Sequence, residues 1–76
     1  MSRIEPIELR EKRFNFLPAC FISHGEPHRI WRVEEIWSRP ARWRRPPRNY
    51  FRVRCVDNQV YQIVQDLRIN AWYVEH

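Results

Sequence analysis

Apolar and polar side chains alternate along much of this 76-residue chain, with the period of two that is typical of β-strands. The pattern is clearest over residues 28–37. There, one face carries Trp31, Val33, Glu35 and Trp37, and the opposite face carries Ile30, Arg32, Glu34 and Ile36. Large apolar groups on both faces indicate a strongly bent strand in a small barrel.

Residues 14–22 are apolar and aromatic enough for an earlier strand, in which Pro18 lacks a backbone donor and indicates an edge position or a break. A turn is expected over residues 23–27. Gly25 is the single glycine of the chain, and we expect it to adopt a positive φ angle in this turn.

Residues 50–56 and 60–67 predict a hairpin, with Asp57, Asn58 and Gln59 as its loop and Asn58 in the left-handed conformation. In that register, Cys55 lies opposite Tyr61. The residues expected to share one face are Phe51, Val53, Cys55, Tyr61 and Ile63, with Val53 opposite Ile63. A short last strand is expected over residues 71–75, with Trp72 and Val74 on one face.

These elements predict a single all-β domain over residues 14–76, preceded by a flexible arm over residues 1–13. The expected fold is a strongly twisted antiparallel meander that closes into a small SH3-like barrel of about five strands. A chain of this size buries only about 60% of its unfolded surface, so the core is small. We predict a core of Phe21, Ile30, Val33, Phe51, Val53, Ile63, Trp72 and Val74.

A cationic loop is expected over residues 38–49, between the strand patterns. The segment 37–50 contains five arginines, three prolines, two tryptophans and a tyrosine, and it has no acidic residue. The net charge is +5, with Lys12 as the single lysine beside thirteen arginines. Arginine binds carboxylates and phosphates with a planar fork, so the excess indicates a binding surface. A genome with a high GC content would produce the same bias without a function.

Nine residues in and beside this loop form the predicted binding site: Arg39, Arg42, Trp43, Arg44, Arg45, Arg48, Tyr50, Arg52 and Arg54. The arginines would contact phosphates of nucleic acid, and the aromatic rings would stack on unpaired bases. Two alternatives stay open at this stage: an acidic protein partner, or a solvated face whose arginines pair with Glu34, Glu35 and Asp66. We therefore expect a non-catalytic interaction module. The alternative is a protein-protein module that uses exposed strand edges and aromatic residues, without nucleic acid.

Enzymatic chemistry has little support in the sequence. There are three serines, no threonine and no phosphate-binding glycine loop, and neither cysteine has an evident catalytic base. Glu34 and Glu35 are adjacent, so they point to opposite faces of a strand and cannot act as one acid/base dyad. If the face that carries Glu35 is buried, we expect this carboxylate to pair with an arginine.

A metal site is also disfavoured. Cys20, His24, His28 and Cys55 offer zinc ligands, but the paired CxxC spacing is absent and both cysteines lie in apolar runs. We expect neither a cofactor nor a metal. The N-terminal residues lack the apolar core of a signal peptide, and the chain has no membrane-length apolar window, so we expect a cytoplasmic protein with reduced thiols. The sequence leaves the oligomeric state open, and a monomer is favoured.

Beyond Pro27, the order of features resembles a small bacterial domain family of unknown function. Similar modules occur at the C-terminus of catalytically inactive Y-family polymerase homologues in bacterial mutagenesis complexes. The resemblance covers about residues 27–75 and is carried by Pro27, Ile30, Val33-Glu34-Glu35, Trp37, Arg39-Pro40, Trp43, Tyr50-Phe51-Arg52-Val53, Val60-Tyr61, Asp66 and Trp72-Tyr73-Val74-Glu75. It departs from the family at Asp57-Asn58, where Asp-Gly is usual. The resemblance implies a partner in a DNA-processing complex, a link to DNA repair or translesion synthesis, and no catalytic residue.

Overall fold

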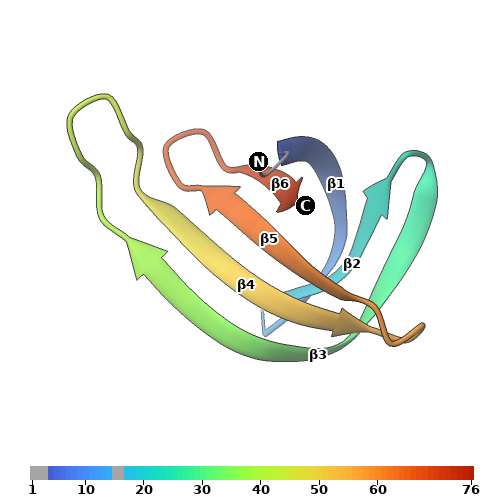
Figure 1. The fold of residues 1–76 in the computed structure, drawn as a ribbon. Helices are drawn as coiled ribbons and strands as arrows, with labels where there is room; N and C mark the ends of the chain where they lie inside the picture. The colour runs from blue at the N-terminus through green and yellow to red at the C-terminus, as the bar shows by residue number, and fades with distance from the viewer. Residues whose placement is uncertain (1–3, 15–16) are drawn as a thin grey trace.

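The computed structural model describes residues 4–14 and 17–76. Within them, six strands follow one another in chain order and close into an antiparallel barrel, in which the first strand pairs with the last (Figure 1). The strands are β1 (Ile4–Arg13), β2 (Leu17–Ser23), β3 (Glu26–Arg39), β4 (Arg48–Cys55), β5 (Val60–Asp66) and β6 (Ala71–Glu75). The predicted all-β class and small antiparallel barrel are confirmed, with six strands where about five were expected.

The flexible arm predicted for residues 1–13 is wrong over the part that the structure describes. Ile4–Arg13 forms β1, which pairs with β6 through its first half and with β2 through its second half. Ile7 and Leu9 pack against the core from this strand. The physical reason is closure, because β1 supplies backbone partners to two strands that would otherwise present open edges. Residues 1–3 of the expected arm lie outside the described residues.

Strand β2 begins at Leu17, later than predicted, and Phe14 lies in a turn. Residues 15 and 16 of the expected strand lie outside the described residues. Pro18 is aligned with β1, whereas the pairing of β2 with β3 begins only at Cys20. The proline therefore occupies a position with one neighbouring strand, as an edge residue does. The next turn is made by His24 and Gly25, whose φ angles are 53° and 76°, so the predicted positive φ at the glycine is confirmed.

The strict alternation predicted for residues 28–37 is wrong in part, because β3 contains two register irregularities against β4. One lies between Ile30 and Arg32, and the other between Val33 and Glu35. Each bulge inserts one residue and turns the following side chains to the other face. Ile30 and Val33 were predicted on opposite faces, but both pack on the barrel interior.

The β4–β5 hairpin has a three-residue loop that begins one position earlier than predicted. The backbone N–H of Cys55 donates to the carbonyl of Gln59 at 2.9 Å, and that of Asn58 donates to the carbonyl of Cys55 at 2.9 Å. Val53 consequently lies opposite Tyr61, two residues from the predicted pairing, which was wrong. A shift of two preserves the faces of both strands, so the predicted shared apolar face is confirmed. Asn58 is left-handed, with φ of 71°, as expected.

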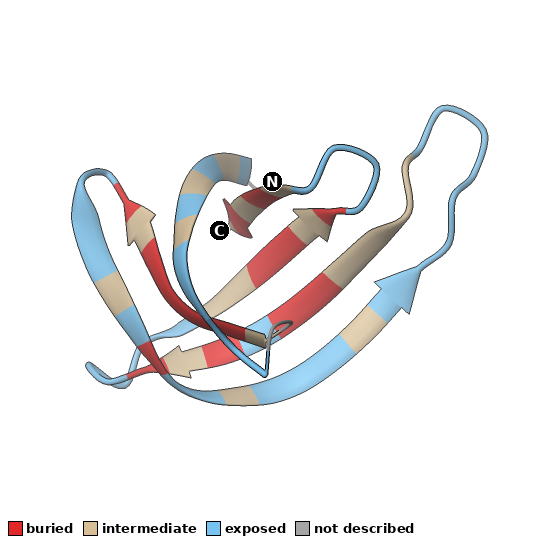
Figure 2. Ribbon diagram, turned by 180° about the vertical axis from the view of Figure 1, so that it is seen from behind, coloured by how far each residue is buried: buried red, intermediate tan, exposed pale blue. Residues whose placement is uncertain are grey.

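The core lies on the inner face of β2, β4, β5 and β6 and at the start of β3, as the buried segments in Figure 2 show. Of the predicted core residues, Val33 is half-buried and the others are buried. The other buried apolar residues in the described part of the chain are Pro18, Ala19, Cys20, Tyr50, Cys55 and Val64. Beyond Ile30, most of β3 and the following loop are exposed, and this β3–β4 hairpin extends past the barrel (Figures 1 and 2).

Candidate functional site

The β3–β4 hairpin ends in a protruding loop over residues 40–47, which is shorter than the predicted loop over 38–49. The two strands stay paired up to Arg39 and Arg48. Within the loop, Arg42 and Arg45 exchange two backbone hydrogen bonds of 3.0 and 2.8 Å. The chain reverses at Trp43 and Arg44, and Arg44 takes a left-handed φ of 61°. Cross-loop hydrogen bonds thus give the apex a defined shape.

Prolines stiffen the loop and anchor its base. The carbonyl of Pro47 accepts a hydrogen bond of 3.0 Å from the backbone N–H of Leu67, which joins the loop to the β5–β6 turn. Pro40 and Pro46 line the concave side of the loop. Because proline has a nearly fixed φ angle, these residues lower the entropy cost of holding neighbouring cations in one place. They were not among the predicted site residues, although the proline spacing of the loop was a signal for them.

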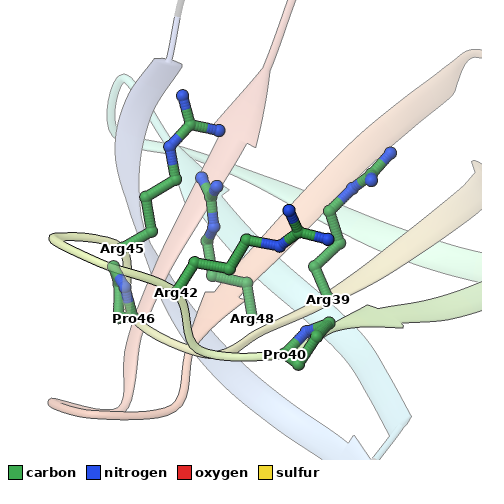
Figure 3. Close-up of a pocket in the computed structure, with 6 residues that line it drawn as sticks. All are labelled: Arg39, Pro40, Arg42, Arg45, Pro46 and Arg48. Atoms are coloured by element: carbon green, nitrogen blue, oxygen red, sulfur yellow. The ribbon is translucent and has the colours of Figure 1, made fainter.

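A cavity of about 220 Å³ opens on that concave side. Its lining consists of Arg39, Pro40, Arg42, Arg45, Pro46 and Arg48. The four arginine side chains project to the same side of the loop (Figure 3). Within the described part of the chain, none of these four guanidinium groups forms an ion pair with a carboxylate. The cavity therefore concentrates positive charge that the rest of the barrel does not neutralise.

Arg48 is the most buried of the four arginines. Its Nε atom is buried and has no hydrogen-bond partner among the described residues. Asp66 lies opposite Arg48 in the sheet register, but its Oδ1 atom accepts the backbone N–H of Arg68 at 2.9 Å. A buried donor without an acceptor is costly, so the position of Arg48 lowers the stability of the loop base while keeping its guanidinium in the cavity lining.

Two stacked aromatic rings contact the arginines of the cavity. The rings of Trp37 and Tyr50 are parallel within 5°, with centroids 5.3 Å apart. The guanidinium carbons of Arg39 and Arg48 lie 6.0 and 5.6 Å from the Tyr50 ring centroid, and that of Arg52 lies 5.8 Å from the Trp37 centroid. Such cation–π contacts hold the arginine side chains in place.

The burial of Tyr50 changes its assignment. Its exposed fraction is 7%, so its ring has no free face for a base, contrary to its predicted role in stacking on a ligand. The reason is the cross-strand pairing with Trp37, which covers the tyrosine ring. We assign Tyr50 a positioning role instead.

Arg52 and Arg54 differ from the cavity arginines because both are paired with carboxylates. Arg52 contacts Glu35 at 2.9 Å, which confirms the predicted pairing of that carboxylate with an arginine. Arg54 contacts Glu34 at 3.1 Å, and Arg32 contacts the same carboxylate at 2.8 Å. Hydrogen bonds from Arg32 and then Arg54 lower the pKa of Glu34. The two glutamates thus neutralise separate arginines and form no acid/base dyad.

Trp43 is the most exposed large apolar side chain of the loop, with an exposed fraction of 83%. The guanidinium carbon of Arg44 lies 5.3 Å from the centroid of its ring, so a cation covers one side of the indole. The rest of the ring is open to solvent. An exposed indole beside unpaired cations is a stacking surface for a flat ligand group.

The four potential zinc ligands do not assemble. His24 is exposed in its turn and hydrogen-bonds Glu5, while His28 stacks on a core phenylalanine at 4.9 Å. Cys20 and Cys55 are buried, and burial raises the pKa of the Cys55 thiol to about 11. Over residues 4–14 and 17–76, no group of three or more histidine, cysteine or acidic side chains has the geometry of a metal site.

No family model, curated protein or solved structure matches this chain. The resemblance to a Y-family polymerase module consequently stays a prediction from the sequence. In the part of the chain that the structure describes, no helix has the length and apolar character that crossing a bilayer requires.

Proposed function

We propose that this protein is a non-catalytic module that binds single-stranded nucleic acid at the tip of the β3–β4 hairpin. One observation carries the proposal: four guanidinium groups line one cavity and have no carboxylate partner among the described residues. Phosphates in the cavity would neutralise these cations, and a base would stack on the exposed ring of Trp43. The proposed binding site therefore contains fewer residues than the site that the sequence predicted.

The geometry favours an unpaired strand over a duplex. Stacking on Trp43 requires a base whose face is accessible, which a paired and stacked base does not offer. The contacts from arginine and indole are directed at phosphates and ring faces, so we expect weak dependence on base sequence. A role in DNA repair or translesion synthesis is part of the proposal only through the sequence resemblance.

A protein-protein function is the second candidate, and one observation favours it. Strand β2 pairs with β3 only over Glu26–Arg29, so the later part of β3 has no strand on that side among the described elements. A peptide could add to this edge. However, the two bulges and the charged side chains along β3 are devices that hinder edge pairing. The nucleic-acid proposal is therefore preferred.

The test is the binding of a short fluorescently labelled single-stranded DNA, followed by anisotropy at low salt. The variant Arg42→Gln/Arg45→Gln removes two cavity cations. Its matched control, Arg10→Gln/Arg29→Gln, removes the same charge from β1 and β3, away from the loop. We expect the cavity variant to bind at least about tenfold more weakly and the control to change little. Equal weakening in both variants, or no binding by the unaltered protein, would refute the proposal.

A further inference from the structure

We propose that the cavity recognises the terminal phosphate of a nucleic acid strand, so that the ligand is a phosphorylated strand end. This inference rests on the proposed function and specifies which part of the strand the site selects. It follows from the charge of the cavity, from its position at a protruding tip, and from the guanidinium of Arg48 in its lining.

The charge of the cavity matches a phosphomonoester better than an internal phosphodiester. A terminal phosphate carries about −1.5 to −2 charges at neutral pH and presents three free oxygens. An internal phosphodiester carries a single charge, and sugars flank it on both sides. The four cavity arginines have no carboxylate partner among the described residues. A terminal phosphate therefore neutralises more of their charge than an internal phosphate does.

The size of the cavity is sufficient for a terminal phosphate group. Its 220 Å³ equals the volume of about seven water molecules. Pro40 and Pro46 form part of its wall, and the bonded pair of Arg42 and Arg45 closes the loop beyond it. The end of a nucleic acid strand can enter such a bounded cavity, whereas an internal segment would need a second opening through which the nucleic acid continues.

Arg48 provides the donor that distinguishes the two kinds of phosphate. The two terminal nitrogens of a guanidinium can bind two oxygens of one group in parallel. The Nε atom of Arg48 is buried and out of reach of a ligand, but Arg48 lines the cavity and pairs with no carboxylate among the described residues, so its terminal nitrogens supply this fork. A monoester can accept the fork with two oxygens and still offer the third to another arginine of the cavity.

Trp43 and Arg44 then define the place of the terminal base. The guanidinium of Arg44 covers one side of the indole at 5.3 Å, and the other side is open. Trp43 directly follows Arg42, which lines the cavity, so the phosphate and the stacking surface adjoin in the chain. The terminal nucleotide is thus held by its phosphate on one side and by its base on the other.

The test compares DNA strands of one sequence that carry a 5′-phosphate, a 3′-phosphate or hydroxyl groups at both ends. We expect one phosphorylated form to bind about tenfold more tightly than the hydroxyl form. Inorganic phosphate should compete with that form. The variant Arg48→Lys keeps the charge but removes the fork, so it should reduce the ratio of the two affinities toward one. Arg10→Lys is the control and should leave the ratio unchanged.

The outcomes separate this inference from the proposed function. Equal binding of all three strands would overturn recognition of the strand end and leave the nucleic-acid module intact. Absence of binding by any strand would overturn both. A full preference in an Arg48→Lys variant that melts like the unaltered protein would also overturn the inference, because the preference would then not depend on the fork.

Discussion

The salt dependence of binding counts the arginines that contact phosphates. On a single strand, each such contact lowers the logarithm of the binding constant by about 0.7 per tenfold rise in salt. The cavity offers four contacts, so we expect a slope no steeper than about −2.8 and a loss of about 50-fold between 50 and 200 mM salt. If Arg52 and Arg54 also left their carboxylates for phosphates, six contacts would give a slope of about −4.2 and a loss of about 300-fold.

Anisotropy titrations with single-stranded DNA at several potassium chloride concentrations measure this slope. Arg42→Gln/Arg45→Gln should halve it to about −1.4, whereas Arg52→Gln should leave it unchanged because Arg52 pairs with Glu35. A slope near −4, or one that the cavity variant does not reduce, would refute the assignment of free and paired arginines.

Four further predictions concern stability and stacking. Asn58→Ala should lower the free energy of unfolding by about 1 kcal/mol in urea titrations, because alanine tolerates the φ of 71° poorly. Asn58→Gly should not lower it, because glycine adopts a positive φ readily. Equal losses of stability in the two variants would contradict this explanation. Burial raises the pKa of Cys55 from 9.0 to about 11, so its contribution to stability should be complete below pH 9 and lost as the pH rises toward 11. Cys55→Val should flatten that part of the stability profile, and an unchanged profile would contradict the assignment. Trp43→Ala should weaken binding of single-stranded DNA at least fivefold without changing the melting temperature. Trp72→Ala should instead remove about 3–5 kcal/mol, a large part of the roughly 4–11 kcal/mol expected for a domain of this size, and a normal melt for this variant would contradict the core assignment.

The local alternation of apolar and polar residues was sufficient to predict the strands that have one apolar face. Phe51 and Val53 alternate with arginines, and Trp72 and Val74 alternate with more polar positions, so their burial could be read from the period of two. The turns were also predictable where a residue type decides the backbone. Gly25 and Asn58 both adopt the positive φ angles that favour these residues.

Strand β1 could not be found in this way. Charged residues flank Ile7 and Leu9, and Pro6 interrupts the run of backbone donors, so the segment has the composition of an arm. Its second half pairs with β2, the next strand along the chain, but its first half depends on β6, which provides backbone partners only once the barrel has closed. No local signal contains that information, because β6 lies far from β1 in the chain.

The sequence by itself determined the all-β class, the faces of the last three strands, the turn residues and a cationic loop between two strands. Only the tertiary structure decided which arginines of that region are free. The second bulge of β3 makes Glu34 an extra residue and brings Glu35 opposite Arg52, so both glutamates take arginines of the sheet. Between Glu35 and the tip of the hairpin, β3 contains no further acidic residue. At the base of the loop, Arg39 lies opposite Arg48 in the sheet register. Cross-strand register, which two bulges shift by one residue each, therefore separates the structural arginines from the candidate ligand-binding arginines.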